Sequence, residues 1–271
     1  EMLTRDWSSD VCSSDLANLG SGTGSSATID VSWGASAPNG RAVEYYLVSV
    51  AGGTPKRVNG TQTSTSMEGI GFSNDRVGVT VAAVNDSSKA DSHTSPVSHT
   101  SLWVVGQPLA PAAVSASATG NDNEVSLQWS PSPAGQGWNP SDFTYQWRVN
   151  GGGWERLSGT TLTGNGLTNG QAANIEIRAV GTKIDGNGTS SPTVGANSVT
   201  PYGPPTVPTM SCSGGVEKVS CSWSGGSGNG RDATYTLSAG ASGEVGASGS
   251  RDFEVSGGAT HQLCEIGRAH V

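Results

Sequence analysis

The chain has 271 residues, 40 of them glycine, and a net charge of −8 at neutral pH. Charged residues make up 13% and hydrophobic residues 34% of the sequence, which suits several small β domains with many turns better than one large core. Nucleic-acid binding is not expected, because the four lysines and the arginines form no basic stripe. No apolar run approaches the roughly 20 residues that span a bilayer, so no membrane insertion is expected either.

The first 16 residues show neither the alternation of a strand nor the periodicity of a helix. Within them DWSSDVCSSDL, residues 6–16, resembles one translated end of a sequencing adapter. EIGRAHV, residues 265–271, resembles the same adapter family read from the other side. We therefore interpret residues 1–16 as a non-native leader and residues 265–271 as a non-native tail, and we expect both to be loosely packed.

Three strands that end in tryptophan recur along the chain at a nearly constant spacing. Trp33, Trp129 and Trp223 close the segments VSW, LQW and CSW and stand 96 and 94 residues apart. Each segment alternates apolar and polar residues, which is the pattern of a strand with one buried face. We expect each tryptophan to lie in the core of its own domain.

A second alternating strand follows each tryptophan and carries a tyrosine. The three strands are EYYLVSV with Tyr46, FTYQWRVN with Tyr145 and ATYTLS with Tyr235. A third landmark is an Ala-Val pair at 83–84 and again at 179–180, each beginning 50 residues after the preceding tryptophan. Agreement at separate landmarks establishes a structural repeat.

Proline-rich segments separate the repeats at 106–111 (GQPLAP) and 200–208 (TPYGPPTVP). Such segments favour an extended, semi-rigid backbone. Short strands between Gly, Asn and Ser turns, without an amphipathic helix, predict an all-β chain of tandem β-sandwiches. The expected domains are repeat one at 17–106, with an incomplete first strand, repeat two at 107–202, and a truncated repeat three at 203–264.

This repeat, with a strand-B tryptophan, a strand-C tyrosine and a strand F ending in Ala-Val, resembles the fibronectin type III family of immunoglobulin-like sandwiches, in its bacterial extracellular form. The resemblance covers residues 17–264. In GLTNGQAANIEIRAV, Leu167, Asn169 and Gly170 match the turn before strand F, whereas Ala173 stands at the family's tyrosine position. The resemblance implies seven-stranded, two-sheet modules used as spacers or binding surfaces.

Repeat three holds Cys212, Cys221 and Cys264. Cys212 and Cys221 flank SGGVEKVS, which reads as a tight connection between strands A and B, so a disulfide between them is expected. The alternative joins Cys221 to Cys264 across the sandwich, as in immunoglobulin domains. A disulfide is consistent with an exported protein. A zinc site is not expected, because no Cys-x-x-Cys spacing occurs.

Trp138 and Trp154 lie outside the repeated core positions, in a loop and in a C′ strand. Exposed tryptophans stack on sugar rings, so these two are candidates for carbohydrate binding. Their alternative role is to cover a sheet edge or to pack domains together.

No catalytic, cofactor or metal site is expected. His93 and His99 have no third metal ligand nearby in the sequence, and no Gly-x-Ser-x-Gly motif accompanies a histidine. The glycine-rich segment at 20–26 precedes a strand, so it lacks the helix N-terminus that binds phosphate. The segments 120–124 and 184–190 offer oxygen ligands without the spacing of a calcium loop, and we interpret them as turns.

These observations predict a non-catalytic spacer or adhesion-type fragment of a larger secreted or cell-surface protein. The expected partners are neighbouring domains of that protein, and a polysaccharide or a cell-surface protein is a further candidate. The alternative hypothesis is a set of carbohydrate-associated accessory modules of an extracellular polysaccharide-degrading enzyme.

Overall fold

The computed structural model describes residues 24–37, 42–85, 94–184, 190–238, 242–256 and 264–268. The regular structure in these ranges is antiparallel β, apart from the single 3-10 turn η1 (Pro140–Asp142), which confirms the expected all-β class. The interpreted leader at 1–16 and the region of an incomplete first strand in repeat one lie outside the described residues.

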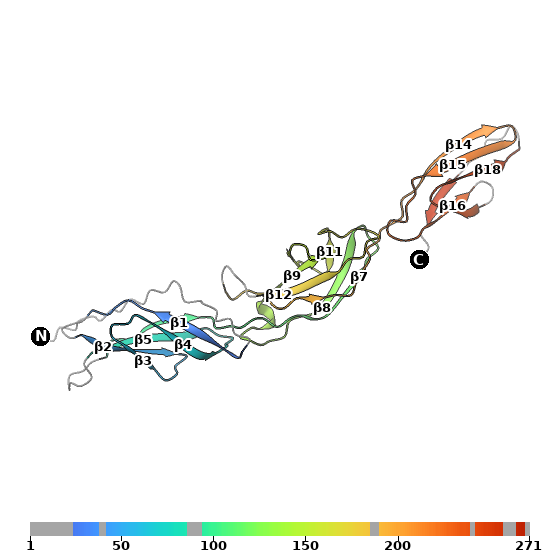
Figure 1. Ribbon diagram of the computed structural model, residues 1–271. Coiled ribbons are helices and arrows are strands. Elements are labelled where there is room, and N and C mark those ends of the chain that lie inside the picture. The colour runs from blue at the N-terminus through green and yellow to red at the C-terminus, as the bar shows by residue number, and fades with distance from the viewer. Residues whose placement is uncertain are drawn as a thin grey trace. The chain divides into compact units, whose positions relative to one another are not determined.

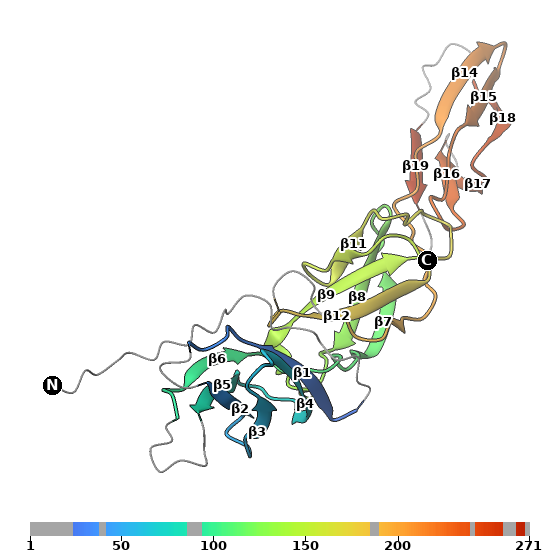
Figure 2. The same ribbon diagram turned by 60° about the vertical axis from the view of Figure 1, so that its left-hand side comes forward.

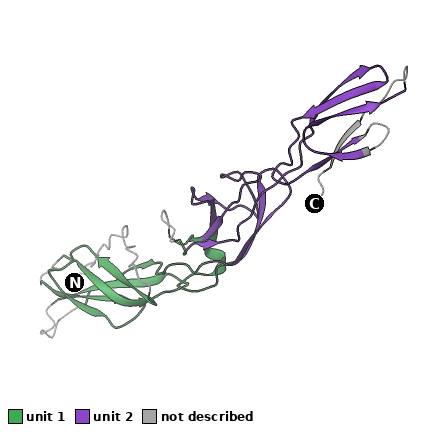
Figure 3. Cartoon of the chain, turned by 45° about the vertical axis from the view of Figure 1, so that its right-hand side comes forward, with its two compact units in different colours: residues 1–110, 131–144, 179–192 green, residues 111–130, 145–178, 193–271 purple. Residues whose placement is uncertain are grey.

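The chain divides into two compact units (Figure 3). One contains residues 1–110, 131–144 and 179–192, and the other contains residues 111–130, 145–178 and 193–271. The division runs through repeat two rather than through a linker.

Repeat one is a sandwich of a two-stranded sheet, in the order β1-β4, and a four-stranded sheet, in the order β3-β2-β5-β6 (Figure 1). Its strands are β1 (Ser26–Ser32), β2 (Val43–Val50), β3 (Lys56–Asn59), β4 (Ser64–Gly71), β5 (Val77–Asn85) and β6 (Ser98–Leu102). The alternation in β1 places Ala27, Ile29 and Val31 on the buried face, as the sequence predicts.

Repeat two has a three-stranded sheet, β11-β8-β7, and a four-stranded sheet, β10-β9-β12-β13. Its strands are β7 (Ala112–Ala118), β8 (Glu124–Ser130), β9 (Phe143–Val149), β10 (Glu155–Arg156), β11 (Thr161–Thr163), β12 (Ile175–Gly181) and β13 (Val194–Gly195). These are the seven strands and two sheets that the fibronectin type III resemblance implies.

Repeat three pairs its strands in the orders β14-β15-β18 and β17-β16-β19 (Figure 2). They are β14 (Thr209–Gly215), β15 (Lys218–Ser224), β16 (Thr234–Ser238), β17 (Ser242–Val245), β18 (Gly249–Glu254) and β19 (Cys264–Arg268). The expectation of a loosely packed tail is wrong for the backbone of residues 265–268, which pairs with β16 in the position of strand F. Sequence alternation is too short there to indicate a strand.

The landmark residues hold equivalent places in repeats one and three. Trp33 and Trp223 are each 6% exposed, and Tyr46 and Tyr235 are each 1% exposed. The ring centroids of Trp33 and Tyr46 lie 5.2 Å apart in an edge-to-face arrangement that aromatic pairs favour.

Repeat two departs from this pattern. Trp129 and Tyr145 are only partly buried, with ring centroids 5.6 Å apart, and both pack against the core of repeat two from its margin. Trp147 on β9 is 4% exposed and packs in the interior. Because a small sandwich has room for few large rings, the additional tryptophan takes the centre and Trp129 lies at the margin.

A buried serine before a proline fixes the connection after strand F in the first two repeats. Ser95 Oγ accepts a hydrogen bond from the Ala83 amide, and Ser191 Oγ accepts one from the Ala179 amide, each at 2.9 Å. Each serine amide donates back to the alanine carbonyl. The Ser-Pro dipeptides are 96 residues apart and belong to the repeat.

We predict that Trp147→Ala lowers the free energy of unfolding of repeat two by roughly 3–5 kcal/mol, because it leaves a cavity between the sheets. Trp129→Ala should cost clearly less, because part of that ring already contacts solvent. Denaturant titration followed by the amide NMR signals of repeat two measures both losses. Equal losses would contradict the interior position of Trp147.

Candidate functional site

The contacts between consecutive repeats are the most elaborate feature outside the cores. The first joint lies within the first compact unit and is centred on Trp138, which is 0% exposed. Its indole N–H donates to the Gly106 carbonyl at 2.7 Å. The ring covers Gly181 so closely that a Cβ there would lie 2.3 Å from it. A residue of repeat two thereby binds the backbone of the linker that follows repeat one.

This burial decides the role of Trp138. A fully buried ring leaves no face for a sugar, so carbohydrate stacking at Trp138 is excluded in this conformation, and its position fits the alternative of packing domains together. Sequence pattern alone does not separate these uses, because a loop tryptophan is equally compatible with both.

Lys183 is a second part of the first joint. Its side chain is 7% exposed, and Nζ lies 3.0 Å from the Asp142 carboxylate. The ammonium also donates to the carbonyls of Gly137, at 2.7 Å, and Asn74, at 3.1 Å, and lies 4.7 Å from the centroid of the Trp103 ring. Because Asn74 and Trp103 belong to repeat one, this single buried cation connects the two repeats.

The second joint lies within the second compact unit and consists of polar side chains. The Asn169 side-chain nitrogen donates to Asp122 at 3.0 Å and to the Asn229 side-chain oxygen at 2.8 Å. The Asn229 side-chain nitrogen in turn donates to the same Asp122 oxygen and to the Pro204 carbonyl. Residues of repeats two and three thus share one carboxylate oxygen.

Two glycines allow the chain segments of repeats two and three to lie close together at the second joint. A Cβ on Gly203 would lie 1.8 Å from the Asp122 carboxylate oxygen. Gly230 has φ of +98°, and a Cβ there would lie 2.6 Å from the Gly170 nitrogen. The second joint therefore needs glycine at both positions. Beside it, the Arg231 guanidinium lies over the Tyr202 ring at 3.4 Å.

Both joints use the turn that precedes strand F of the earlier repeat. That turn is FSN at 72–74 in repeat one and LTN at 167–169 in repeat two. The Asn-Gly-Arg sequence at 229–231, which lies between the Trp and Tyr strands of repeat three, meets the second of these turns. Its counterpart at 39–41 lies outside the described residues.

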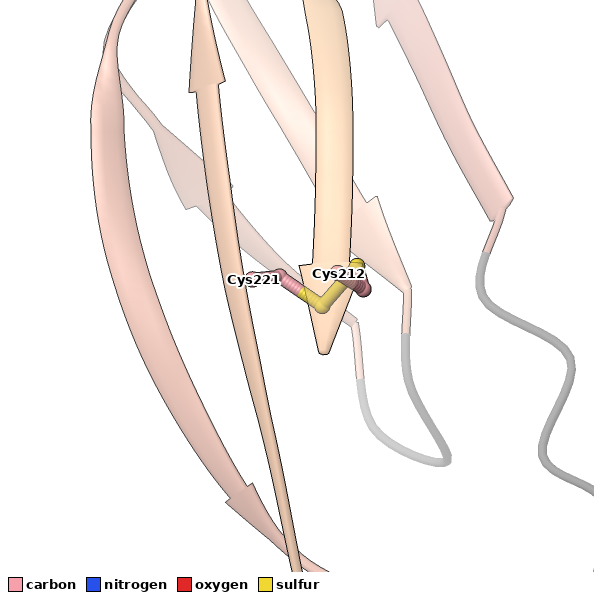
Figure 4. Close-up of a disulfide and its surroundings, with 2 residues drawn as sticks. All are labelled: Cys212 and Cys221. Atoms are coloured by element: carbon pink, nitrogen blue, oxygen red, sulfur yellow. A yellow bond between two sulfur atoms is a disulfide. The ribbon is translucent and has the colours of Figure 1, made fainter. Parts of the chain in front are cut away.

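The disulfide joins Cys212 and Cys221, the pair favoured by the sequence spacing (Figure 4). The two residues are directly opposite each other on the antiparallel strands β14 and β15. Because Cys221 is used in this bond, the alternative pairing with Cys264 is not the one formed. The bond cross-links the first two strands of repeat three, β14 and β15.

Trp154, the second carbohydrate candidate, is half-buried beside two arginines. The guanidinium carbons of Arg178 and Arg148 lie 4.1 and 4.6 Å from its ring centroid. Aromatic surface is therefore already engaged by cations, which leaves less of it for a sugar ring.

Polar side chains in the turn at 119–124 form hydrogen bonds with one another. Glu124, in the segment 120–124, accepts hydrogen bonds from Thr119 and Asn121, and these bonds lower the pKa of its carboxyl group. Among the described residues no cluster of three or more His, Cys, Asp and Glu side chains could hold a metal ion. His99 is an exposed residue of β6, whereas His93 and residues 185–189 lie outside the described part.

Where the structure is described, it contains no helix of sufficient length and apolar character to cross a membrane.

Comparison with known proteins gives similarities in solved structures alone. No protein-family model matches the chain, and the search of curated proteins gives no match. The chain is similar to the FN1–FN3 domains of chicken CNTN1, at 12% identity and a TM-score of 0.27, over 94% of this chain and 97% of that chain. It is also similar to the central fibronectin-III array of RIM-binding protein, at 17% identity and a TM-score of 0.23, over 77% and 78% of the two chains. The sandwich fold itself follows from the strand pairings of this chain.

We predict that Lys183→Met loosens the first joint, because it leaves Asp142 and two carbonyl groups without their cation. The substitution should reduce the free energy that holds the first joint together by roughly 1–3 kcal/mol. Faster hydrogen exchange of the Trp138 indole N–H, followed by NMR, is the expected result.

The matched control is Lys218→Met, which breaks an ion pair with Asp252 whose two side chains are 51% and 59% exposed. That exposed pair should contribute little to stability, because water and salt screen it. Unchanged indole protection in Lys183→Met would show that the cation does not hold the joint.

Proposed function

We propose that this chain is a non-catalytic spacer segment of a larger secreted or cell-surface protein, in which built joints set the geometry between successive sandwiches. The observation that carries the proposal is the shared Asp122 oxygen at the second joint, which accepts hydrogen bonds from Asn169 and Asn229. A flexible tether needs no such side chains, whereas a spacer that transmits position does.

Two further observations support this proposal. The joints lie at Gly106 and at Tyr202–Gly203, where the proposed domains 17–106, 107–202 and 203–264 meet. The Cys212–Cys221 disulfide favours an oxidising compartment, consistent with an extracellular location.

The accessory role in a polysaccharide-degrading enzyme finds less support. It depended on Trp138 and Trp154 as stacking platforms, and the first is buried while the second contacts arginines. The spacer function explains the placement of Trp138, because its indole N–H binds the linker between repeats one and two at Gly106.

We also propose that residues 1–16 derive from adapter sequence, on the resemblance of DWSSDVCSSDL alone. The genomic locus read by an independent method decides this: uninterrupted codons for residues 1–16 would refute the proposal. The corresponding interpretation of 265–271 is weakened by the pairing of residues 265–268 with β16.

We predict that Asp122→Ala makes the second joint flexible, because it removes the acceptor shared by Asn169 and Asn229. Spin labels on unnatural residues at the exposed positions Ser117 and Ser250 report the distance between repeats two and three. The expected result is a narrow distance distribution in the unmodified chain and a broad one in Asp122→Ala, with both repeats still folded.

The matched control is Asn121→Ala in the same turn, because the Asn121 side chain bonds Glu124 within repeat two and makes no bond to the described residues of repeat three. It should leave the distribution narrow. A distribution that is already broad in the unmodified chain would refute the spacer function.

A further inference from the structure

One face of repeat two collects positive charge in an acidic chain. Strand alternation directs Gln146 and Arg148 of β9 outward, because Trp147 and Val149 between and beside them are buried. Glu176 and Arg178 of β12 alternate in the same way with buried neighbours. Arg156 of β10 pairs with Gln146 in the ladder, so it shares this side. We call this surface the arginine face; it comprises Gln146, Arg148, Trp154, Arg156, Glu176 and Arg178.

The arginine face has an excess of cations. It holds three arginines and one glutamate, whereas the chain as a whole has a net charge of −8. Arg148 is compensated by Glu176, at 2.6 Å. Arg178 bonds the neutral Gln146, at 2.9 and 2.7 Å, and exposed Arg156 makes no ion pair with any residue that the structure describes. The preceding acid, Glu155, belongs to the other side of β10, since it pairs with Trp147.

Two of the three arginines, Arg148 and Arg178, are also held in place. Trp154 lies beside the guanidinium groups of Arg148 and Arg178, and the bonds to Glu176 and Gln146 fix their orientation. Ordering an arginine side chain costs conformational entropy, so prior ordering favours binding. Burial, and then repulsion by Arg148, lower the pKa of Arg178, so an anion nearby would stabilise its charged form.

We propose that the arginine face binds the carboxylate groups of an acidic polysaccharide. Guanidinium groups bind carboxylates through two parallel hydrogen bonds. The Glu176 carboxylate, of which one oxygen bonds Arg148, can accept from the hydroxyl groups that sugars carry beside their carboxylates, and the Gln146 side-chain nitrogen can donate to them. Arg156 and Arg178 lie on strands separated by one other strand, which places them about 10 Å apart across the sheet. This separation allows two carboxylates of one extended polymer to bind together.

The same observations disfavour other polyanions. Nucleic acids need many clustered cations to neutralise their phosphates, and three arginines on a chain of net charge −8 do not provide them. An acidic peptide offers carboxylates but few hydroxyl groups for Glu176 and Gln146 to bind. The surface acts independently of the proposed spacer function, since neither joint contains a residue of the arginine face.

The experiment titrates the intact chain with a short oligogalacturonate and follows binding by calorimetry and amide NMR. Binding should shift the amide signals of β9, β10 and β12 and weaken as salt is added. Arg156→Gln and Arg178→Gln should each weaken binding roughly tenfold or more, as expected for a charged hydrogen bond. Thermal melting of each variant establishes that repeat two remains folded.

The matched control is Arg57→Gln on repeat one. Arg57 has the same combination of partners as Arg148, an ion pair with Glu44 and a stacked ring of Tyr45, and among the described residues no second arginine joins these contacts. Its loss should leave binding unchanged. Absence of binding to oligogalacturonate, or equal losses in Arg57→Gln and Arg178→Gln, would overturn the proposal. Equal affinity for polyglutamate or DNA would overturn its assignment to a polysaccharide.

Discussion

The side chain and amide of Asn169 make four hydrogen bonds at the point where repeat two meets repeat three. Its backbone amide donates to Asn123 and its side-chain oxygen accepts from the amide of Asn123, both at 2.8 Å. Its side-chain nitrogen then bonds Asp122 and Asn229. The first pair of bonds holds two turns of repeat two together, and the second pair extends that fixed structure to the next repeat. The turns that are fixed within repeat two thereby also bind repeat three.

The two joints achieve connection by different chemistry. The first buries the Trp138 ring and the Lys183 ammonium, so it combines apolar area with a cation surrounded by oxygens and rings. The second relies on short amide and carboxylate side chains near the surface, where water competes for each bond. Geometry in the second joint therefore depends on several weak bonds acting together, with glycines that let the backbones approach.

Much of the architecture was predictable because it depends on local periodicity. Alternation and the spacing of Trp33, Trp129 and Trp223 predict sandwiches, and the position of the cysteines indicates the disulfide that forms. The interior of repeat two was not predictable in the same way, because alternation marks both Trp129 and Trp147 as inward and does not decide which ring fits the centre. That choice depends on the volume between the sheets.

The joints were less predictable still. Trp138 and Asn229 occur in loops, and their partners Gly106, Asp122 and Asn169 are 32 to 107 residues away in the sequence. No period of two or of 3.6 residues encodes such contacts. The repetition of the turn before strand F, as FSN and LTN, is the one local signal that points to them.

Residual dipolar couplings of the intact chain test the ordered second joint most directly. One alignment tensor should fit the amides of β7, β8 and β11 in repeat two together with those of β14, β15 and β18 in repeat three. Two tensors, with a smaller magnitude for one repeat, would show independent motion and would contradict a joint fixed through Asn169.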